Sequence, residues 1–377
     1  MVIATGAGVR RLTDSPHELT LRTALVLAAC LLLLTGIALA ASMLAAPAAY
    51  AQAKELNIYS ARHYQTDQQL YDGFAKAHNV KINRVDSDDA GVMQRLRAEG
   101  ASSPADVVLM VDAARLSMAD NAGLFAPIKS SALEKAVPVQ YRAAATADGT
   151  TWFGFSTRAR LIVYNKAQVK RADVDTYEEL ADAKNKGKVC TRSGSHPYNL
   201  SLFSVMYEHM GEAATQNYLQ GMVNNMARSP KGGDTDQIKA VASGECGVAL
   251  TNSYYLARMM RSGNPADRSV IEKVGVVFPN QTTWGTHMNI AGGAVAKHSK
   301  NKQLAQQFLE YLASAKAQDY FANGNNEWPV VQGVSLPNPA LRAMTGGKKF
   351  KSETIPVAVV GKHQTRVQQL LDRVGYK

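Results

Sequence analysis

Hydrophobic residues recur along this chain with two periods. Runs in which apolar and polar residues alternate predict strands, and segments in which apolar residues recur every three or four positions predict helices. Beyond the N-terminal region the two kinds of segment alternate, with short links between them. They are a strand at 55–60, a helix from Thr66, a strand at 80–85, a helix at 91–99, a strand at 105–110 and a helix at 113–121. This alternation predicts a parallel sheet covered by helices, as in α/β domains.

The extended segment 152–164 is unusually long for one strand. A strand that passes from one lobe into another would have this length. The second block of elements comprises helices at 177–184, 200–210, 212–226 and 234–243 and strands at 188–192 and 247–251. The third comprises a strand at 289–296, helices at 301–313, 315–321 and 359–374, a polar turn at 324–326 and a turn-rich stretch at 329–347. We therefore expect two α/β lobes, with the chain crossing twice between them.

The length of the chain agrees with two lobes. It has 377 residues, of which 46% are hydrophobic. A single core usually stops growing near about 250–300 residues, so a chain of this length has room for two.

The first 51 residues have the order of a secretory signal. A basic segment precedes an apolar run at 24–41, and small residues then end at Ala51. We expect cleavage after Ala51 and export. A membrane anchor formed by the same apolar run, a lipoprotein signal at Cys30 and twin-arginine export through Arg10 and Arg11 stay open as alternatives.

The net charge is strongly positive, but its carriers are dispersed. The whole chain carries a formal charge of +11, and +10 remains without residues 1–51, which hold three arginines against one aspartate and one glutamate. A basic protein can bind nucleic acid, a membrane surface or an anionic ligand. Because the lysines and arginines are scattered and form no tract, we interpret them as a solvated basic surface and expect no nucleic-acid partner.

Three short clusters contain residues suited to a metal ion. They are Arg62-His63-Tyr64, Ser195-His196-Pro197-Tyr198-Asn199 and Asn252-Ser253-Tyr254-Tyr255. Phenolate oxygens are hard donors, so four tyrosines and a histidine favour a hard, highly charged cation, with ferric iron as the first candidate. Any one of these tyrosines taken alone is more often a packed aromatic residue. The hypothesis therefore depends on their combination.

The predicted elements place these clusters where ligands can be bound. The first cluster lies where a strand ends, just before a helix for which Thr66 and Gln69 form a capping box. Tyr198 is expected in a loop after Pro197. Asn252 or Ser253 can cap a helix, so we expect the Tyr254–Tyr255 pair in its first turn, from which both side chains reach around one ion.

Two cysteines follow the predicted signal, Cys190 and Cys246. An exported protein permits disulfides, so a bridge between them is the natural pairing, and two free buried thiols are the alternative. Cys190 precedes Tyr198 by eight residues, and Cys246 precedes Tyr254 by eight residues. If the bridge joins two parallel strands, the equal separations of eight residues would bring both tyrosines to the same edge of the sheet.

A site with four phenolates needs positive charge nearby. Four phenolates around Fe³⁺ carry a net charge of −1, which Arg62, Arg158 or Arg192 can offset, and a guanidinium can also hold a small anion such as carbonate. Ordinary surface salt bridges are the alternative role for these arginines.

The motifs of common enzymes are not found in this sequence. It shows no glycine-rich phosphate loop, zinc-ligand spacing or nucleophile elbow, and no serine–histidine–aspartate triad can be assembled from its motifs. We therefore expect a binding protein and not an enzyme.

From Leu56 to Lys377 the chain resembles the periplasmic ferric-ion-binding proteins of bacterial ABC importers, in particular their tyrosine-rich subgroup. The segments that carry this resemblance are Tyr59-Ser60-Ala61-Arg62-His63-Tyr64, Pro104-Ala105-Asp106-Val107, Thr157-Arg158-Ala159-Arg160, Gly187-Lys188-Val189-Cys190, Arg192-Ser193-Gly194, Tyr198-Asn199, Gly232-Gly233-Asp234, Asn252-Ser253-Tyr254-Tyr255 and Gly285-Thr286-His287. The resemblance implies a type II periplasmic binding protein fold, in which two lobes close over the ion. Its lobes would be 52–157 with 284–334 and 158–283 with 335–377.

The resemblance also implies which lobe supplies each ligand of the ion. Tyr198, Tyr254 and Tyr255 would bind the ion from the second lobe, and Tyr64, with His63, would come from the first. Some relatives replace the tyrosine nearest Tyr64 by an anion held at the arginine that matches Arg62. Because this chain has both residues, its dependence on carbonate is an open question.

Together these observations lead to one hypothesis with two alternatives. The chain would be a monomeric periplasmic receptor that captures Fe³⁺ and delivers it to an ABC permease in the inner membrane. A binding protein for a chelated iron complex or an oxyanion is the first alternative. A secreted enzyme is the second, and its nucleophile or general base is not found.

Overall fold

The computed structural model describes residues 54–377 except 63, 332 and 335–337. The described residues do not include the expected signal segment 1–51, to which the alternative signals also belong. They do not include the expected ligand His63 either. Within the described part of the chain, no helix is both long and apolar enough to cross a lipid bilayer.

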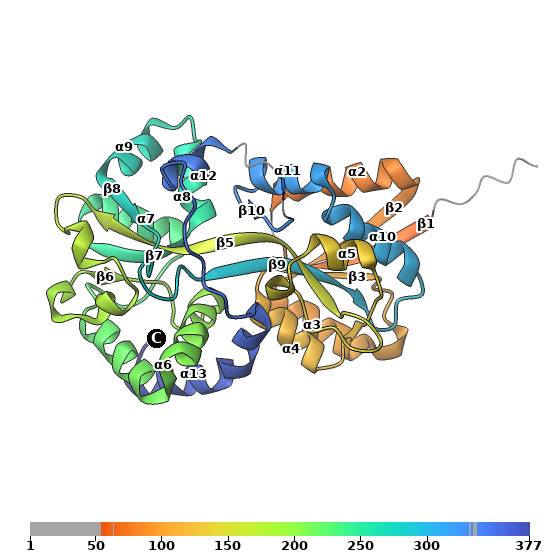
Figure 1. Ribbon diagram of the computed structural model, residues 1–377, viewed down its shortest axis with the longest axis horizontal. Coiled ribbons are helices and arrows are strands. Elements are labelled where there is room, and N and C mark those ends of the chain that lie inside the picture. The colour runs from red at the N-terminus through yellow and green to blue at the C-terminus, as the bar shows by residue number, and fades with distance from the viewer. Residues whose placement is uncertain (1–53, 63, 332, 335–337) are drawn as a thin grey trace, which may run out of the picture. The chain divides into compact units, whose positions relative to one another are not determined.

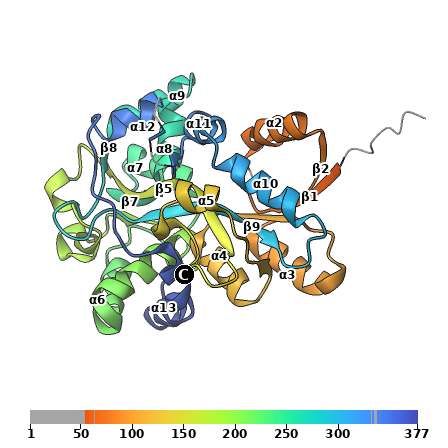
Figure 2. The same ribbon diagram turned by 45° about the vertical axis from the view of Figure 1, so that its right-hand side comes forward.

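The first lobe, as we name the part around strands β1–β3, confirms the predicted alternation. Strands β1 (Lys54–Ser60), β2 (Val80–Asp86) and β3 (Val107–Met110) pair in parallel, with β1 in the middle. The connecting helices are α2 (Gln68–His78), α3 (Asp89–Glu99) and α4 (Ala113–Asn121). Helices α3 and α4 lie on one face of this sheet, and α2 lies on the other with α10 (Lys302–Leu312) and α11 (Ala315–Asn323) (Figures 1 and 2).

The sheet as a whole is mixed, whereas the sequence predicted a parallel one. Strand β9 (Met288–Ala296) pairs antiparallel to β3, and the short β4 (Phe125–Ala126) pairs antiparallel to β9. The long β5 (Trp152–Asn165) also runs antiparallel to β9. Since β5 carries the chain out of the first lobe and β9 returns it, their directions are opposed.

Strand β5 joins the two lobes, as its length predicted. Trp152 to Ala159 pair with β9, and the following residues pair with β7 (Val248–Asn252) and β8 (Val274–Val277). Strand β6 (Val189–Cys190) pairs in parallel with β7, and we name the part around β6–β8 the second lobe. In Figure 1, β5 and β9 run side by side through the centre from one lobe to the other.

The second lobe differs from the prediction in one of its helices. The two helices predicted at 200–210 and 212–226 are confirmed within α6 (Pro197–Asn224), where the non-helical Gly211, with φ at 78° and ψ at 177°, separates them. The helix predicted at 177–184 is wrong. Two 3₁₀ turns, Glu178–Ala181 and Ala183–Asn185, occur there, because Asp182 between them is extended with ψ at 145°. Helix α7 (Asp234–Ser243) has the predicted bounds.

The remaining elements complete both lobes. They are α5 (Ser131–Ala136), α8 (Ser253–Met260), α9 (Pro265–Lys273), β10 (Trp328–Pro329), α12 (Pro339–Met344) and α13 (Val360–Val374), with 3₁₀ turns at Gln65–Asp67, Gly100–Ser102, Val139–Tyr141, Arg171–Asp173 and Val357–Val359. Helix α12 packs on α8, and α13 packs on both α6 and α4. The lobe boundaries given above stay a prediction.

Each lobe has a hydrophobic core of its own. In the first, Phe74, Phe308 and Phe321 pack together beneath α2, α10 and α11. In the second, Phe203 and Leu371 pack between α6 and α13. Burying one such side chain contributes about 1.5–3 kcal/mol relative to leaving it exposed. Strands β5 and β9 connect these two cores. Side chains from both lobes meet on these strands.

Candidate metal centre

Tyr254 and Tyr255 lie in the first turn of α8, as predicted. Strand β7 ends at Asn252 and α8 begins at Ser253, so both tyrosines follow a strand end directly. Their rings stack with centroids 4.2 Å apart. Asn252 occupies the N-cap position, but its side chain makes no cap hydrogen bond, because its oxygen accepts a hydrogen bond from Arg160.

Tyr198 lies in a helix, and the prediction of a loop is wrong. Pro197 is the first residue of α6, where the missing N–H of proline costs nothing. His196 precedes it as the N-cap, and its Nδ1 accepts a hydrogen bond from the Tyr198 N–H at 3.2 Å. The cap fixes the first turn of α6, and the Tyr198 hydroxyl reaches the Tyr254 hydroxyl at 3.1 Å.

The disulfide and the strand register account for the meeting of Tyr198 and Tyr254. Cys190 and Cys246 are bridged, with 5.8 Å between their Cα atoms, which confirms the expected pairing. Cys190 lies on β6, while Cys246 lies just ahead of β7. Strands β6 and β7 are parallel neighbours, and each tyrosine follows its bridged cysteine by eight residues. Both phenols therefore lie at the same edge of the sheet.

Tyr64 approaches the same place from the first lobe. It follows β1, and its ring stands edge-on to that of Tyr254, with centroids 5.8 Å apart and planes at 82°. Its hydroxyl also lies 3.4 Å from a carboxylate oxygen of Glu327. The three sequence clusters therefore meet in space, through contacts that run from Tyr64 to Tyr254 and from Tyr254 to Tyr198 and Tyr255.

Arg158 is the positive charge at the centre of this cluster. It projects from β5 and is 0% exposed, and its guanidinium carbon lies 5.6 Å from the centre of the Tyr198 ring. Among the described residues none forms a hydrogen bond with its three guanidinium nitrogens, although Nη1 lies 3.5 Å from Glu327. A buried guanidinium in this state is able to pair with negative charge that develops on the tyrosines.

The other expected arginines have partners of their own. Arg62 contacts Asp67 at 2.6 Å through Nε and Glu327 at 3.6 Å through Nη2. Arg160 and Arg192 both contact Asp234, at 2.7 and 3.2 Å.

The pairing of Arg62 also explains why the predicted capping box is wrong. Helix α2 begins at Gln68, after Asp67, and not at Thr66. The Asp67 carboxylate caps no helical N–H, because Arg62 and Asn325 use its oxygens.

Without a metal, the hydroxyls of Tyr64, Tyr198 and Tyr254 are neutral. Burial is the main cause that raises the pKa of Tyr64, Tyr198 and Tyr254 above the ordinary value of 10. A further increase comes from the negative charge that each neighbouring tyrosine would carry, while Arg158 lowers the pKa of all three. Only a strongly charged cation would therefore displace these protons near neutral pH, as metals do for coordinated thiols.

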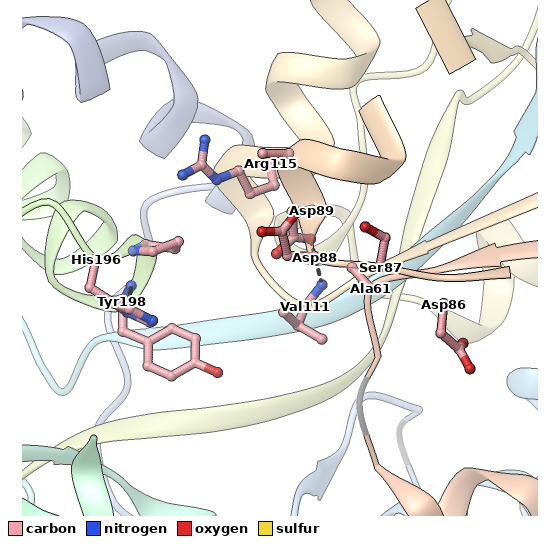
Figure 3. Close-up of a pocket in the computed structure, with 11 residues that line it drawn as sticks. Ala61, Asp86, Ser87, Asp88, Asp89, Val111, Arg115, His196 and Tyr198 are labelled. Atoms are coloured by element: carbon pink, nitrogen blue, oxygen red, sulfur yellow. Dashed lines mark hydrogen bonds between the residues drawn. The ribbon is translucent and has the colours of Figure 1, made fainter. Parts of the chain in front are cut away.

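A pocket opens beside the tyrosines between residues of both lobes. Its volume is about 600 Å³. Figure 3 shows His196 and Tyr198 on one side of it and Asp88, Asp89 and Arg115 on the other. Within the described ranges, His, Cys, Asp and Glu form no group of three that could hold a metal ion.

A family model described as bacterial extracellular solute-binding protein matches residues 69–345 of this chain. The chain belongs to this family. The matched residues include Tyr198, Tyr254, Tyr255 and Arg158, together with Glu327. The structure has the type II periplasmic binding protein fold.

Relatives of this solute-binding protein have been characterised and solved. Iron uptake protein A1 of Synechocystis is 42% identical over 324 residues, which is 86% of this chain and 88% of that protein. The Trichodesmium protein IdiA/FutA, solved in complex with iron and citrate ligands, is 46% identical with a TM-score of 0.80, and the match covers 86% of this chain and 100% of that one. The ferric binding protein of Campylobacter jejuni is 35% identical with a TM-score of 0.79, over 85% and 100% of the two chains.

Glu327 is a residue of this candidate site that the sequence did not reveal. It lies just ahead of β10, is 0% exposed and contacts Tyr64, Arg62 and Arg158. In the sequence it directly follows the polar turn predicted at 324–326, where glutamates are usually solvated. The signal that could have pointed to it is the strand-like Trp328-Pro329-Val330 that follows directly.

Proposed function

We propose that this solute-binding protein captures ferric iron in the periplasm and delivers it to an ABC permease in the inner membrane. The observation that carries the proposal is the meeting of Tyr64, Tyr198, Tyr254 and Tyr255 beside a buried, charged Arg158. The names of the relatives from Synechocystis and Campylobacter supply the ion. The family is one of binding proteins, and this chain acts by binding and not by catalysis.

The ligands we propose are the four tyrosines and, as the fifth, His63. Hard phenolate oxygens suit Fe³⁺, which displaces their protons on binding. Tyr198, Tyr254 and Tyr255 belong to the second lobe and would hold the ion first. Tyr64 and His63 would then complete its shell from the first lobe. Arg158 would offset the net charge of −1 that four phenolates leave on Fe³⁺.

Carbonate is a second component that the site could hold. Arg62, the residue expected to bind it, already contacts Asp67 and Glu327. Arg158 is then the guanidinium to which a small anion could bind beside the ion. We therefore propose that iron binds without carbonate, and that carbonate, where present, lies against Arg158.

A chelated ferric ion is the second candidate ligand. The pocket beside Tyr198 has a volume of about 600 Å³, far more than a bare ion needs, and Arg115 lies on its wall. The Trichodesmium relative was solved with both iron and citrate. A chelate would place its metal at the tyrosines and its carboxylates in the pocket.

Three further properties belong to the same proposal. Export would depend on the signal at 1–51, so that the mature protein begins near residue 52. The protein would act as a monomer, since each lobe has a core of its own. Its partner would be the permease, which receives the ion when the lobes open.

The test is a visible absorption spectrum of the mature protein after loading with ferric iron, with and without bicarbonate. Coordination by tyrosinate should give a charge-transfer band, and Tyr255→Phe should weaken both the band and the affinity, by roughly tenfold or about 1.4 kcal/mol. Tyr218→Phe is the matched control, because Tyr218 is buried away from the site and its hydroxyl has no hydrogen-bond partner in the described part of the chain. A colourless loaded protein would contradict the proposal, and unchanged affinity in Tyr255→Phe would remove that residue from the site.

A further inference from the structure

Glu327 is a buried carboxylate held rigidly at the edge of the tyrosine cluster. Its backbone N–H donates to the Phe321 carbonyl, and the preceding Asn326 has a left-handed backbone with φ at 58°. Arg261 and Asn338 both donate hydrogen bonds to the side chain of Asn326. Because the turn is fixed on both sides, the carboxylate of Glu327 has little freedom to leave the site.

The side chain of Glu327 contacts Ser156, Tyr64 and two arginines. The Ser156 hydroxyl donates to Oε2 at 2.7 Å, and the Tyr64 hydroxyl donates to Oε1 at 3.4 Å. Nη2 of Arg62 lies 3.6 Å from Oε2, and Nη1 of Arg158 lies 3.5 Å from Oε1. Arg62 has a second carboxylate partner in Asp67. For Arg158, Glu327 is the only carboxylate within ion-pair distance among the residues that the structure describes.

The charge around Arg158 must differ between the empty and the loaded site. In the empty site Glu327, at 3.5 Å, is the carboxylate that faces this buried guanidinium, and a buried guanidinium without a negative partner would be strongly destabilising. In the loaded site four phenolates and Fe³⁺ carry a net charge of −1, which Arg158 balances by itself. A carboxylate 3.5 Å away is then surplus negative charge in a poorly solvated place.

We propose that Glu327 is an internal counter-charge that neutralises Arg158 while the site is empty and competes with the tyrosinates for it when iron is bound. Glu327 therefore stabilises the iron-free protein and weakens iron binding, which favours release to the permease. This inference rests on the proposed function and deepens it, because it names the residue that sets how tightly the ion is held.

A different role is open to a buried carboxylate at this place. Carboxylate oxygen is itself a hard donor, so Glu327 could be a ligand of the metal. The two roles make opposite predictions. Removing a ligand weakens iron binding, whereas removing a competing counter-charge strengthens it.

The variant Glu327→Gln separates the two roles, because glutamine keeps the volume and an acceptor for Ser156 but carries no charge. We expect the iron-free variant to unfold at a lower temperature than the iron-free parent. We also expect ferric affinity, measured by competition with citrate, to rise roughly tenfold, which corresponds to about 1.4 kcal/mol. The charge-transfer band should keep its position, because the set of phenolates is unchanged. Weaker iron binding with a shifted band would overturn the inference in favour of a ligand role, and unchanged melting and affinity would overturn it outright.

Two further variants control for merely structural effects. Asp106→Asn removes another buried carboxylate, which lies just ahead of β3 and whose partners are the neutral groups of Asn57, Ser299 and Asn301. It should lower the stability of both forms alike and leave affinity unchanged. Adding Arg158→Gln to Glu327→Gln should restore part of the iron-free stability lost in Glu327→Gln. A double variant that melts below both single variants would contradict the pairing.

Failure of this inference can be told apart from failure of the proposed function. The melting temperatures of the iron-free variants test the pairing of Glu327 with Arg158 without any metal. A parent protein that binds no ferric iron would overturn the proposed function and, with it, the competition with tyrosinates, while those melting temperatures would still report on the pair.

Discussion

Four tyrosines of the same chemistry occupy different positions in the candidate site. Tyr198 and Tyr254 share a hydrogen bond of 3.1 Å, and Tyr255 stacks on Tyr254. The ring of Tyr64 stands edge-on to that of Tyr254. A contact of this kind contributes about 0.5–1.5 kcal/mol. Under the proposed function, Tyr64 would add coordination of the ion from the first lobe.

At this scale we predict that Tyr64→Phe weakens iron binding mainly by speeding release. The three tyrosines of the second lobe still capture the ion, so the association rate should change little, while release to a competing chelator should become roughly tenfold faster, since affinity differences among variants lie mostly in dissociation rates. Stopped-flow loss of the charge-transfer band measures this rate. Tyr198→Phe is the comparison, because it should also reduce the initial capture. Parent-like release from Tyr64→Phe would exclude Tyr64 as a ligand.

Two strand-to-helix junctions are the elements that build the site. Strand β6 leads towards α6 and Tyr198, and β7 leads into α8 and Tyr254. The bridge between Cys190 and Cys246 fixes the relative positions of these strands just before they lead into the site. The disulfide therefore contributes to the distance between two proposed ligands as well as to stability.

We predict that replacing both cysteines with serine costs stability and, to a smaller degree, iron affinity. The bridge closes a loop with a sequence separation of 56, for which chain entropy predicts a loss of roughly 4 kcal/mol in the free energy of unfolding. Denaturant unfolding of the iron-free protein measures this loss. Ferric affinity should fall by a few-fold, because β6 and β7 keep their hydrogen bonds but lose the covalent constraint. A variant with parent-like stability would show that the bridge does not constrain the unfolded chain.

At the scale of the whole molecule, Glu353 joins three distant segments close to the crossing strands. His287 Nδ1, just ahead of β9, lies 3.2 Å from its carboxylate, and His209 Nε2 of α6 lies 3.6 Å from it. Its backbone N–H donates to the Thr286 carbonyl. Burial by itself raises the pKa of Glu353, but His209 and His287 outweigh it and hold that pKa below the ordinary value of 4.5.

This lowered pKa predicts how stability depends on pH. The unfolded chain binds the proton of Glu353 more readily than the folded protein does, so the stabilisation is present above pH 4.5 and is lost as pH falls through the folded value. Glu353→Gln should therefore be less stable at pH 7, by about 1–3 kcal/mol, and should lose less of its stability on acidification. Urea unfolding between pH 3 and pH 7 measures both effects. Parallel curves for variant and parent would show that Glu353 does not titrate with folding.

Much of the local structure was predictable, because it depends on neighbouring residues. The bounds of α4 and α7 agree with the apolar period, and the first turn of α8 lies at the predicted Tyr254–Tyr255 pair. The wrong predictions occur where tertiary contacts compete with local signals. Asp67 binds Arg62 and caps no helix, and Asp182 is extended within a helix-like sequence.

The sequence by itself determined the kinds of donor in the site, the two pairs of elements that carry them and the cysteines that could hold those elements together. These properties follow from side-chain chemistry and short-range periodicity. Only the tertiary structure decided that Tyr64 meets Tyr254 across the lobes, that Arg62 is already paired, and that Glu327 balances Arg158. Glu327 and Tyr64 are separated by 263 positions. Their contact depends on how two cores pack on shared strands, a long-range property that no local pattern records.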